Sequence, residues 1–238
     1  MLFPPPLPGT TRTTVELETR DDGLPMVLWT GAVVDGHDPS GSAPRVAKGP
    51  GVPLLGEQAH GLLTRPHLRG FRVGEGDGPG ATGASWTPRL VVEEMTHDDE
   101  RLVFVSRDDA AGLAVTVELE SVAGGALRVR AAVTNVGAGR YVVDGLEIAL
   151  PVADHLVEAL DFTGRHERER VPQRHQVTDG LWLREERGGR PGLDAATQVI
   201  LGTPGFSFTH GEVLAVHVAW SGNSVLRLER GAANGTTL

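Results

Sequence analysis

The sequence contains no cysteine, few aromatic residues and fewer basic than acidic side chains. Without cysteine, disulfides and thiolate metal sites are excluded. Lysine and arginine number 22 against 31 aspartates and glutamates, which gives a net charge of −9. The chain therefore lacks the phosphate-neutralising surface that a nucleic-acid binder needs. No apolar run of about 18 residues could span a bilayer, and no basic stripe favours binding at a membrane surface.

The sequence also lacks the marks of a targeting segment. Its start, Met1–Gly9, has neither the basic region nor the apolar region of a signal peptide, and its prolines would interrupt a helix. We therefore expect a cytoplasmic protein that has neither nucleic acid nor membrane among its partners.

Motifs for metal binding and catalysis are missing as well. The histidines form no His-Glu-x-x-His motif, and His155, His166 and His175 are too widely spaced for one helix face. No metal and no cofactor is therefore predicted. The glycine run Gly74–Gly80 is not followed by the helix that a phosphate-binding loop needs. Adjacent acids such as Asp21-Asp22 are typical of solvated turns rather than of a glycosidase carboxylate pair, so no catalytic residue is predicted.

What is abundant favours β structure. The 238 residues are rich in valine, leucine and threonine and include 32 glycines and 16 prolines, a composition typical of short strands joined by turns. We predict an all-β fold of two packed, mainly antiparallel sheets in a single domain over residues 1–238. Long loops are expected at Gly36–Pro53 and Gly74–Gly83, and a short helical turn at Ala153–Leu160. Strands are predicted at Arg12–Thr19, Pro25–Val34, Leu102–Val105, Leu113–Glu120, Ala126–Asn135, Tyr141–Pro151, Trp182–Glu186, Thr197–Leu201 and Glu212–Trp220.

Two local patterns give more detail. Ala123-Gly124-Gly125 separates two alternating runs and predicts a hairpin turn, to which Tyr141–Pro151 is expected to add a third consecutive strand. In Glu212–Trp220 both faces are apolar, which predicts a central strand covered on each side. His217 within it is expected to be a neutral core histidine rather than a ligand or base.

Several motifs, taken in order, resemble the N-terminal domain of the family 36 glycoside hydrolases, the α-galactosidases. Each motif is weak alone, but their order across nearly the whole chain is specific. The matching segments are Val27–Gly31, Leu54–Gly61 with Arg65-Pro66, Trp86–Leu90, Leu150–Asp154, Thr163–Arg170, Arg187–Asp194 and Gly211–Asn223.

This resemblance implies a galactose-mutarotase-like β-supersandwich that precedes a catalytic (β/α)₈ barrel, which we expect downstream and outside this chain. It also implies retaining hydrolysis of terminal α-linked galactose by two aspartates of that barrel. The expected partners are the barrel and, through the parent enzyme, galactosides, and a homo-oligomer remains open. The candidates for binding or interdomain contact are Glu57, Arg65, Trp220 and Asn223. The isolated chain is expected to be inactive.

The chain departs from the family pattern at several positions, and alternatives remain open. Many members have tryptophan in place of His166 and histidine in place of Leu193, and some have aspartate near Leu63. A divergent substrate preference, a degenerate copy or a stand-alone carbohydrate-binding or mutarotase-like sandwich is therefore open, beside a purely structural scaffold. The arginine-rich segment Arg165–Arg170 either makes surface ion pairs or grips a neighbouring domain.

Overall fold

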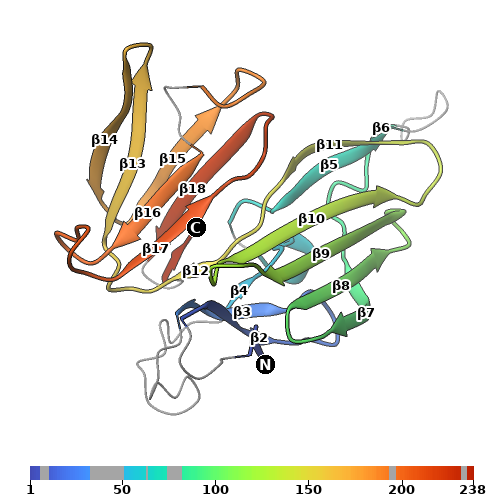
Figure 1. Cartoon of the computed structure of the whole chain (residues 1–238). Coiled ribbons are helices and arrows are strands. Elements are labelled where there is room, and N and C mark those ends of the chain that lie inside the picture. The colour runs from blue at the N-terminus through green and yellow to red at the C-terminus, as the bar shows by residue number, and fades with distance from the viewer. Residues whose placement is uncertain (6–10, 33–50, 63, 74–81, 193–196, 232–234) are drawn as a thin grey trace. The chain divides into compact units, whose positions relative to one another are not determined.

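The structure is a computed structural model that describes residues 1–5, 11–32, 51–62, 64–73, 82–192, 197–231 and 235–238. Within these residues the chain forms strands β1 to β19, and the only helix is the short 3₁₀ helix η1, Gln58–His60 (Figure 1). No helix in the described ranges is long and apolar enough to cross a membrane. The predicted all-β class is confirmed. The fold divides into two compact units, with described residues at Met1–Leu150 in unit 1 and at Pro151–Leu238 in unit 2. The single-domain assignment for residues 1–238 stays a prediction.

Unit 1 contains three antiparallel sheets. The first has the order β1-β2-β3-β4, which are Leu2–Phe3, Thr13–Glu18, Met26–Ala32 and Val52–Pro53. The second has the order β10-β9-β8-β7, which are Leu127–Asn135, Leu113–Ser121, Arg101–Asp108 and Val91–His97. The third has the order β11-β5-β6, which are Arg140–Leu146, Leu68–Val73 and Thr82–Ala84.

The turn between β9 and β10 has the predicted chemistry. Gly124 and Gly125 have φ angles of +87° and +81°, a region that side-chain-bearing residues rarely adopt. The predicted meander of β9, β10 and β11 is nevertheless not formed as such, because its third strand lies in another sheet. Strands β7 to β10 form a meander in chain order, whereas β11 pairs with β5 and joins another sheet. Local alternation predicts that a segment is a strand, but it does not identify the strand's partner.

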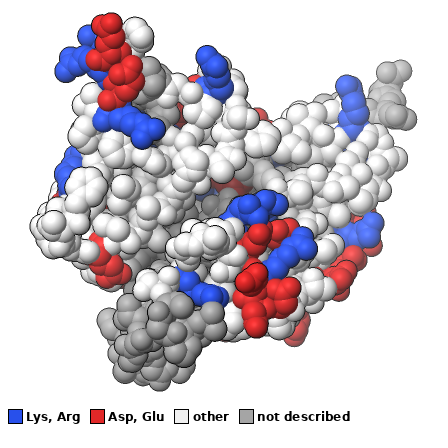
Figure 2. Space-filling model, in the orientation of Figure 1, with Lys and Arg blue, Asp and Glu red and all other residues white. Residues whose placement is uncertain are grey.

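Period-two alternation explains the core of unit 1. Leu102 and Phe104 on β8 are buried, and so is every second residue of β9 from Leu113 to Leu119. These side chains pack with Val15, Leu17 and Leu68 of the other two sheets. The opposite face of β8 to β10 carries charged pairs such as Arg101–Glu118, so one face is apolar and the other is solvated. On the face shown in Figure 2, basic side chains are interspersed with acidic ones.

Unit 2 is a sandwich of two antiparallel sheets around its own core. One sheet has the order β12-β19-β18-β15, which are Pro151–Val152, Gly235–Thr237, Ser224–Gly231 and Gly180–Glu186. The other has the order β14-β13-β16-β17, which are Arg168–Gln176, Glu158–Arg165, Gln198–Gly202 and Val213–His217. Val199 and Leu201 from one sheet pack with Leu226 and Leu228 from the other.

The structure corrects the prediction for the strand at Glu212–Trp220. β17 pairs with β16 alone among the described strands, so it is an edge strand rather than a central one. Leu214 and Val216 pack on the core, but Val213 is 49% exposed and His217 is also exposed, not buried in the core. In the described part of the chain, Val213 and Ala215 on the outer face are therefore exposed rather than buried.

Three further predictions are modified. Ala153–Leu160 holds one tight turn, in which the Leu156 N–H donates to the Ala153 carbonyl, and the segment then enters β13. The ends of the two expected loops form short strands, β4 and β6, while residues 33–50 and 74–81 lie outside the described residues. The long hairpin β13–β14 and the strands β5, β7, β18 and β19 were not predicted.

Candidate functional site

Glu57 lies inside unit 1 rather than on its surface, with only 4% of its area exposed. It lies between β4 and η1, as the N-cap residue of η1. The backbone N–H of Leu90 donates to Oε1 at 2.9 Å, and Nδ1 of His60 lies 2.8 Å from Oε2. Nε2 of His60 contacts the carbonyl oxygen of Asp22. Both carboxyl oxygens of Glu57 therefore join separate segments of unit 1.

Burial changes the acidity of Glu57. Loss of solvation raises the pKa of its carboxyl to about 7, although the Leu90 N–H and His60 act in the opposite direction. Because the Asp22 carbonyl can only accept, Nε2 of His60 carries a proton. In the neutral ring Nδ1 is then an acceptor, to which a protonated Glu57 can donate. One proton satisfies both side chains, which makes this pair a structural connection.

Arg65 lies close to Glu57 in the sequence but has different contacts. Its side chain is 43% exposed, and its Nε lies 3.8 Å from Oε1 of Glu147. Arg69 contacts the same oxygen at 2.5 Å through Nη1. The structure therefore does not join Glu57 and Arg65 in one constellation, and Arg65 keeps part of its guanidinium available at the surface.

Trp220 and Asn223 do come together, in the turn between β17 and β18. Oδ1 of Asn223 accepts a hydrogen bond from the backbone N–H of Gly189 at 2.8 Å, which ties the turn to the connection after β15. Trp220 is 65% exposed, and its indole lies so close to Gly222 that a Cβ there would collide with Nε1. The turn thus presents an aromatic ring to its surroundings from a fixed backbone.

An apolar surface of unit 2 lies on the outer face of the sheet that contains β17. We call this the outer apolar face, and it consists of Leu160, Phe162, Ile200, Val213 and Ala215. Strand alternation places these residues opposite the core positions Val199 and Leu201, and each is half-buried or exposed. The same face also carries the Glu158–Arg174 ion pair, and the ring of Phe206 packs on Gly202, so groups of this chain border the apolar residues. Its exposed part, at Val213, is a candidate surface for interaction.

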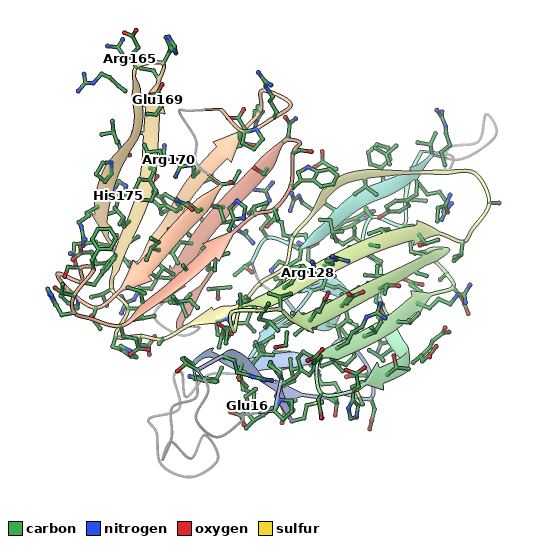
Figure 3. The ribbon with its side chains drawn as sticks, in the orientation of Figure 1. Glu16, Arg128, Arg165, Glu169, Arg170 and His175 are labelled. Atoms are coloured by element: carbon green, nitrogen blue, oxygen red, sulfur yellow. The ribbon has the colours of Figure 1, made fainter. Side chains whose placement is uncertain are left out.

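The arginine-rich segment forms the end of the hairpin β13–β14, which projects from unit 2 (Figures 1 and 3). In the described part of the chain, no ion pair engages the guanidinium groups of Arg165, Arg168 or Arg170, and all three residues are exposed. Arg174, further along β14, pairs with Glu158 and stacks on the ring of Phe206. The surface ion pairs considered for this segment are therefore made by Arg174 alone.

Sequence reasoning missed the most buried acid of unit 2. Asp161 is 1% exposed and lies on the core side of β13. Arg184 of β15 donates to its Oδ2 through Nε at 2.8 Å and through Nη2, while Nε2 of His175 lies 3.0 Å from Oδ1. Nη2 of Arg184 also donates to Oε1 of Gln173 at 3.0 Å. A charged residue at a core position of an alternating strand is the signal that could have revealed it.

None of these groups has the composition of a metal centre. Among the described residues, no cluster of three or more histidine, cysteine, aspartate or glutamate side chains could hold a metal ion. The predicted candidates form two separate sets, with Glu57 and Arg65 in unit 1 and Trp220 and Asn223 in unit 2.

Solved structures share this arrangement of strands. An α-galactosidase from Lactobacillus brevis aligns with a TM-score of 0.73 and 15% identity, over 94% of this chain and 34% of its own. The family 36 α-galactosidase AgaA from Geobacillus stearothermophilus, in complex with stachyose, aligns with a TM-score of 0.70 and 15% identity, over 95% of this chain and 35% of its own. The fold is therefore the all-β fold found in a part of these larger proteins.

The sequence comparisons identify the family. Residues 55–238 match the Glycosyl hydrolase family 36 N-terminal domain. The chain is also 37% identical to an α-galactosidase of Escherichia coli over 176 residues, which are 74% of this chain and 24% of that protein. The chain belongs to glycoside hydrolase family 36, as its N-terminal domain. It spans about a quarter of the E. coli relative and about a third of the two solved proteins.

Proposed function

We propose that this chain is the non-catalytic N-terminal domain of an α-galactosidase, which packs on a catalytic barrel and shapes the entrance for the substrate. The match to the family's N-terminal domain carries this proposal. In the parent enzyme the barrel hydrolyses terminal α-linked galactose with retention of configuration, through its own two carboxylates. The chain contributes a supporting surface and no reacting group.

The outer apolar face supports one choice of docking surface. The relatives are three to four times as long as the segment that matches this chain, so most of the parent protein lies outside it. Val213 is 49% exposed on β17, and the same strand leads into the exposed Trp220. Packing of the catalytic domain on this face would remove that apolar area from water. This burial contributes a favourable free energy of about 25 cal/mol for each Å².

Two further features are consistent with contact to a neighbouring domain. The unpaired arginines Arg165, Arg168 and Arg170 project on a hairpin, where carboxylates of a partner could reach them. Assembly of several copies of the parent enzyme is part of the same proposal, and gel filtration of the full-length enzyme tests it. The cytoplasmic location also remains part of the proposal, and cell fractionation tests it.

A chimera tests the docking proposal. The chain replaces the matching N-terminal segment of the E. coli α-galactosidase, and hydrolysis of a chromogenic α-galactoside is measured. We expect an active chimera that loses most of its activity when Val213→Glu places a charge on the outer apolar face. Val143→Glu is the matched control, because Val143 is 47% exposed on β11 of unit 1. Equal activity of both variants would contradict the choice of this face.

A further inference from the structure

A cavity of about 260 Å³ opens in unit 2 at the connection from β14 to β15. Its polar lining comes from His175, Gln176, Thr178 and Asp179, and its aromatic lining comes from Trp182. Pockets for small molecules combine an apolar wall with a few fixed polar groups and begin at about 300 Å³. This cavity is therefore of a size that suits one small ring rather than a large ligand.

The buried network behind the cavity fixes the chemistry of His175. Arg184 donates two N–H groups to Oδ2 of Asp161, in charge-assisted hydrogen bonds. Oδ1 of Asp161 then accepts a hydrogen bond from Nε2 of His175 at 3.0 Å. When the neutral ring donates from Nε2 to this oxygen, Nδ1 is left as an acceptor.

Nδ1 of His175 has no hydrogen-bond partner within the residues that the structure describes. The side chain is 35% exposed and lines the cavity, and Figure 3 shows it on β14 far from Arg165 at the hairpin end. Through Nε2, His175 completes the buried network at Oδ1 of Asp161, because Arg184 contacts the other carboxylate oxygen. His175 adds an oriented acceptor at the wall of an open cavity.

Trp182 supplies a flat apolar surface beside this acceptor. Its ring centre is 6.0 Å from that of His175, with 45° between the planes, and the guanidinium carbon of Arg184 lies 5.8 Å from the Trp182 ring centre. The contact with Arg184 keeps the indole in place. An oriented acceptor next to an aromatic face matches a ligand that has hydroxyl donors on its edge and C–H groups on its face.

Asp179 restricts the charge of the ligand. Its side chain is 74% exposed at the cavity lining and lies 3.8 Å from Nε of Arg230. A carboxylate beside the neutral acceptor of His175 disfavours an anion. The Thr178 hydroxyl at the cavity lining can donate and accept hydrogen bonds, as neutral hydroxyl groups require.

We propose that this cavity binds one neutral pyranose ring, either a monosaccharide or an end unit of an oligosaccharide, and so forms a sugar-binding site outside any catalytic centre. The cavity and its lining do not depend on the proposed function. Only the choice of galactose as the first probe rests on that function. The ring packs on Trp182, and one hydroxyl donates to Nδ1 of His175.

Nuclear magnetic resonance on the 238-residue chain tests this site. Galactose, glucose, raffinose and sulfate are titrated separately while amide, indole and imidazole signals are followed. We expect at least one sugar to give saturable shifts in the millimolar range at His175, Gln176 and Trp182, and sulfate to give none there. Two-bond nitrogen–proton correlations should place the His175 proton on Nε2. No saturable shift at the cavity with any sugar, or stronger binding of sulfate there, would overturn the site.

His175→Gln is the decisive variant, because its amide can still donate to Asp161 while the ring acceptor is lost. We expect sugar binding to weaken about tenfold, which corresponds to about 1.4 kcal/mol. His217→Gln, the same change at an exposed site on β17, should bind as the original chain does. If His175→Gln unfolds, the exposed Thr178→Ala replaces it, with an expected loss of about threefold. Unchanged binding in the folded cavity variant would overturn the assignment.

The chimera separates the two proposals. If the chimera is active, loses activity with Val213→Glu and shows no sugar binding at His175, only the sugar site is contradicted. If the chimera is inactive but sugar binding depends on His175, only the docking proposal is contradicted.

Discussion

Nδ1 of His60 lies 2.8 Å from Oε2 of Glu57, within a chain of hydrogen bonds in unit 1. The contact joins residues three apart in η1, but its neighbours come from distant segments. The carbonyl oxygen of Asp22 contacts Nε2 of His60, and the backbone N–H of Leu90 donates to Oε1 of Glu57. The residue that the family motif singled out thus acts within the fold, and its acidity links stability to pH.

Glu57 should make stability fall as pH rises from about 4.5 to about 7. Its pKa is raised from 4.5 to about 7 in the folded chain, so the folded state binds the proton more tightly than the unfolded state. Stability from this group is complete below the unfolded pKa and is lost as pH passes the folded value. The full effect is about 3 kcal/mol in the free energy of unfolding, measured by urea unfolding across the pH range.

Glu57→Gln isolates that effect, because the amide can accept from Leu90 and donate to Nδ1 of His60 without titrating. Asp108 and His60 are the other titratable groups that act on Glu57, and both remain in the variant. We expect the difference in unfolding free energy between variant and parent to grow in favour of the variant above pH 5. A constant difference across that range would contradict the raised pKa.

Removing the charge of Asp161 should destabilise unit 2. Asp161→Asn leaves Arg184 without its carboxylate, and breaking a buried pair costs about 3 kcal/mol. The matched control is Glu118→Gln, which breaks the pair with Arg101, whose side chain is 57% exposed. We expect the control to unfold almost as the parent does. Equal unfolding curves for the two variants would show that the Asp161 network contributes little.

The two glycines of the β9–β10 turn should respond differently to alanine. Both have positive φ, but a Cβ at Gly124 meets nothing within 4 Å, whereas one at Gly125 lies 2.5 Å from the carbonyl oxygen of Thr11. Gly124→Ala should cost about 1 kcal/mol from backbone strain alone. Gly125→Ala should cost at least about 2 kcal/mol, because the backbone at Thr11, just before β2, must also move. Thermal unfolding measures which variant loses more stability. A larger loss in Gly124→Ala than in Gly125→Ala would contradict the close approach of Thr11 to Gly125.

Trp220 should change its solvent access when a catalytic domain is attached. In the isolated chain Trp220 is 65% exposed, and Trp86 of unit 1 is similarly exposed, at 62%. Iodide quenching of fluorescence should therefore fall when Trp220→Phe removes one accessible indole, and fall similarly in Trp86→Phe. In the chimera with the E. coli relative, we expect the Trp220 contribution to be shielded. Unchanged quenching of Trp220 in an active chimera would place this turn away from the interface.

The sequence predicted individual strands better than their partners. Alternation at Leu113–Glu120 and the glycines that follow located β9, β10 and their turn correctly, because these features are local. The pairing of β11 with β5 joins residues about 70 apart, and nothing in either strand specifies it. For β17, an apolar pattern on both faces was interpreted as central, although one face is uncovered in this chain.

The candidate residues show a similar limit. Family motifs identified Trp220 and Asn223, which share one turn, but the same motifs gave no sign that Glu57 is buried. Asp161, His175 and Arg184 lie on three strands, and their contact depends on how the two sheets of unit 2 face each other. A single sequence contains no record of that pairing, so the cavity beside His175 could not be predicted.

The proposed non-catalytic role is tested most directly by hydrolysis of a chromogenic α-galactoside, measured for the purified chain alone and for its chimera with the E. coli catalytic segment. We predict no turnover by the chain and turnover by the chimera, because the proposed function assigns the reacting carboxylates to the attached domain. Turnover by the isolated chain that persists through repeated purification and follows the protein itself would contradict the non-catalytic role.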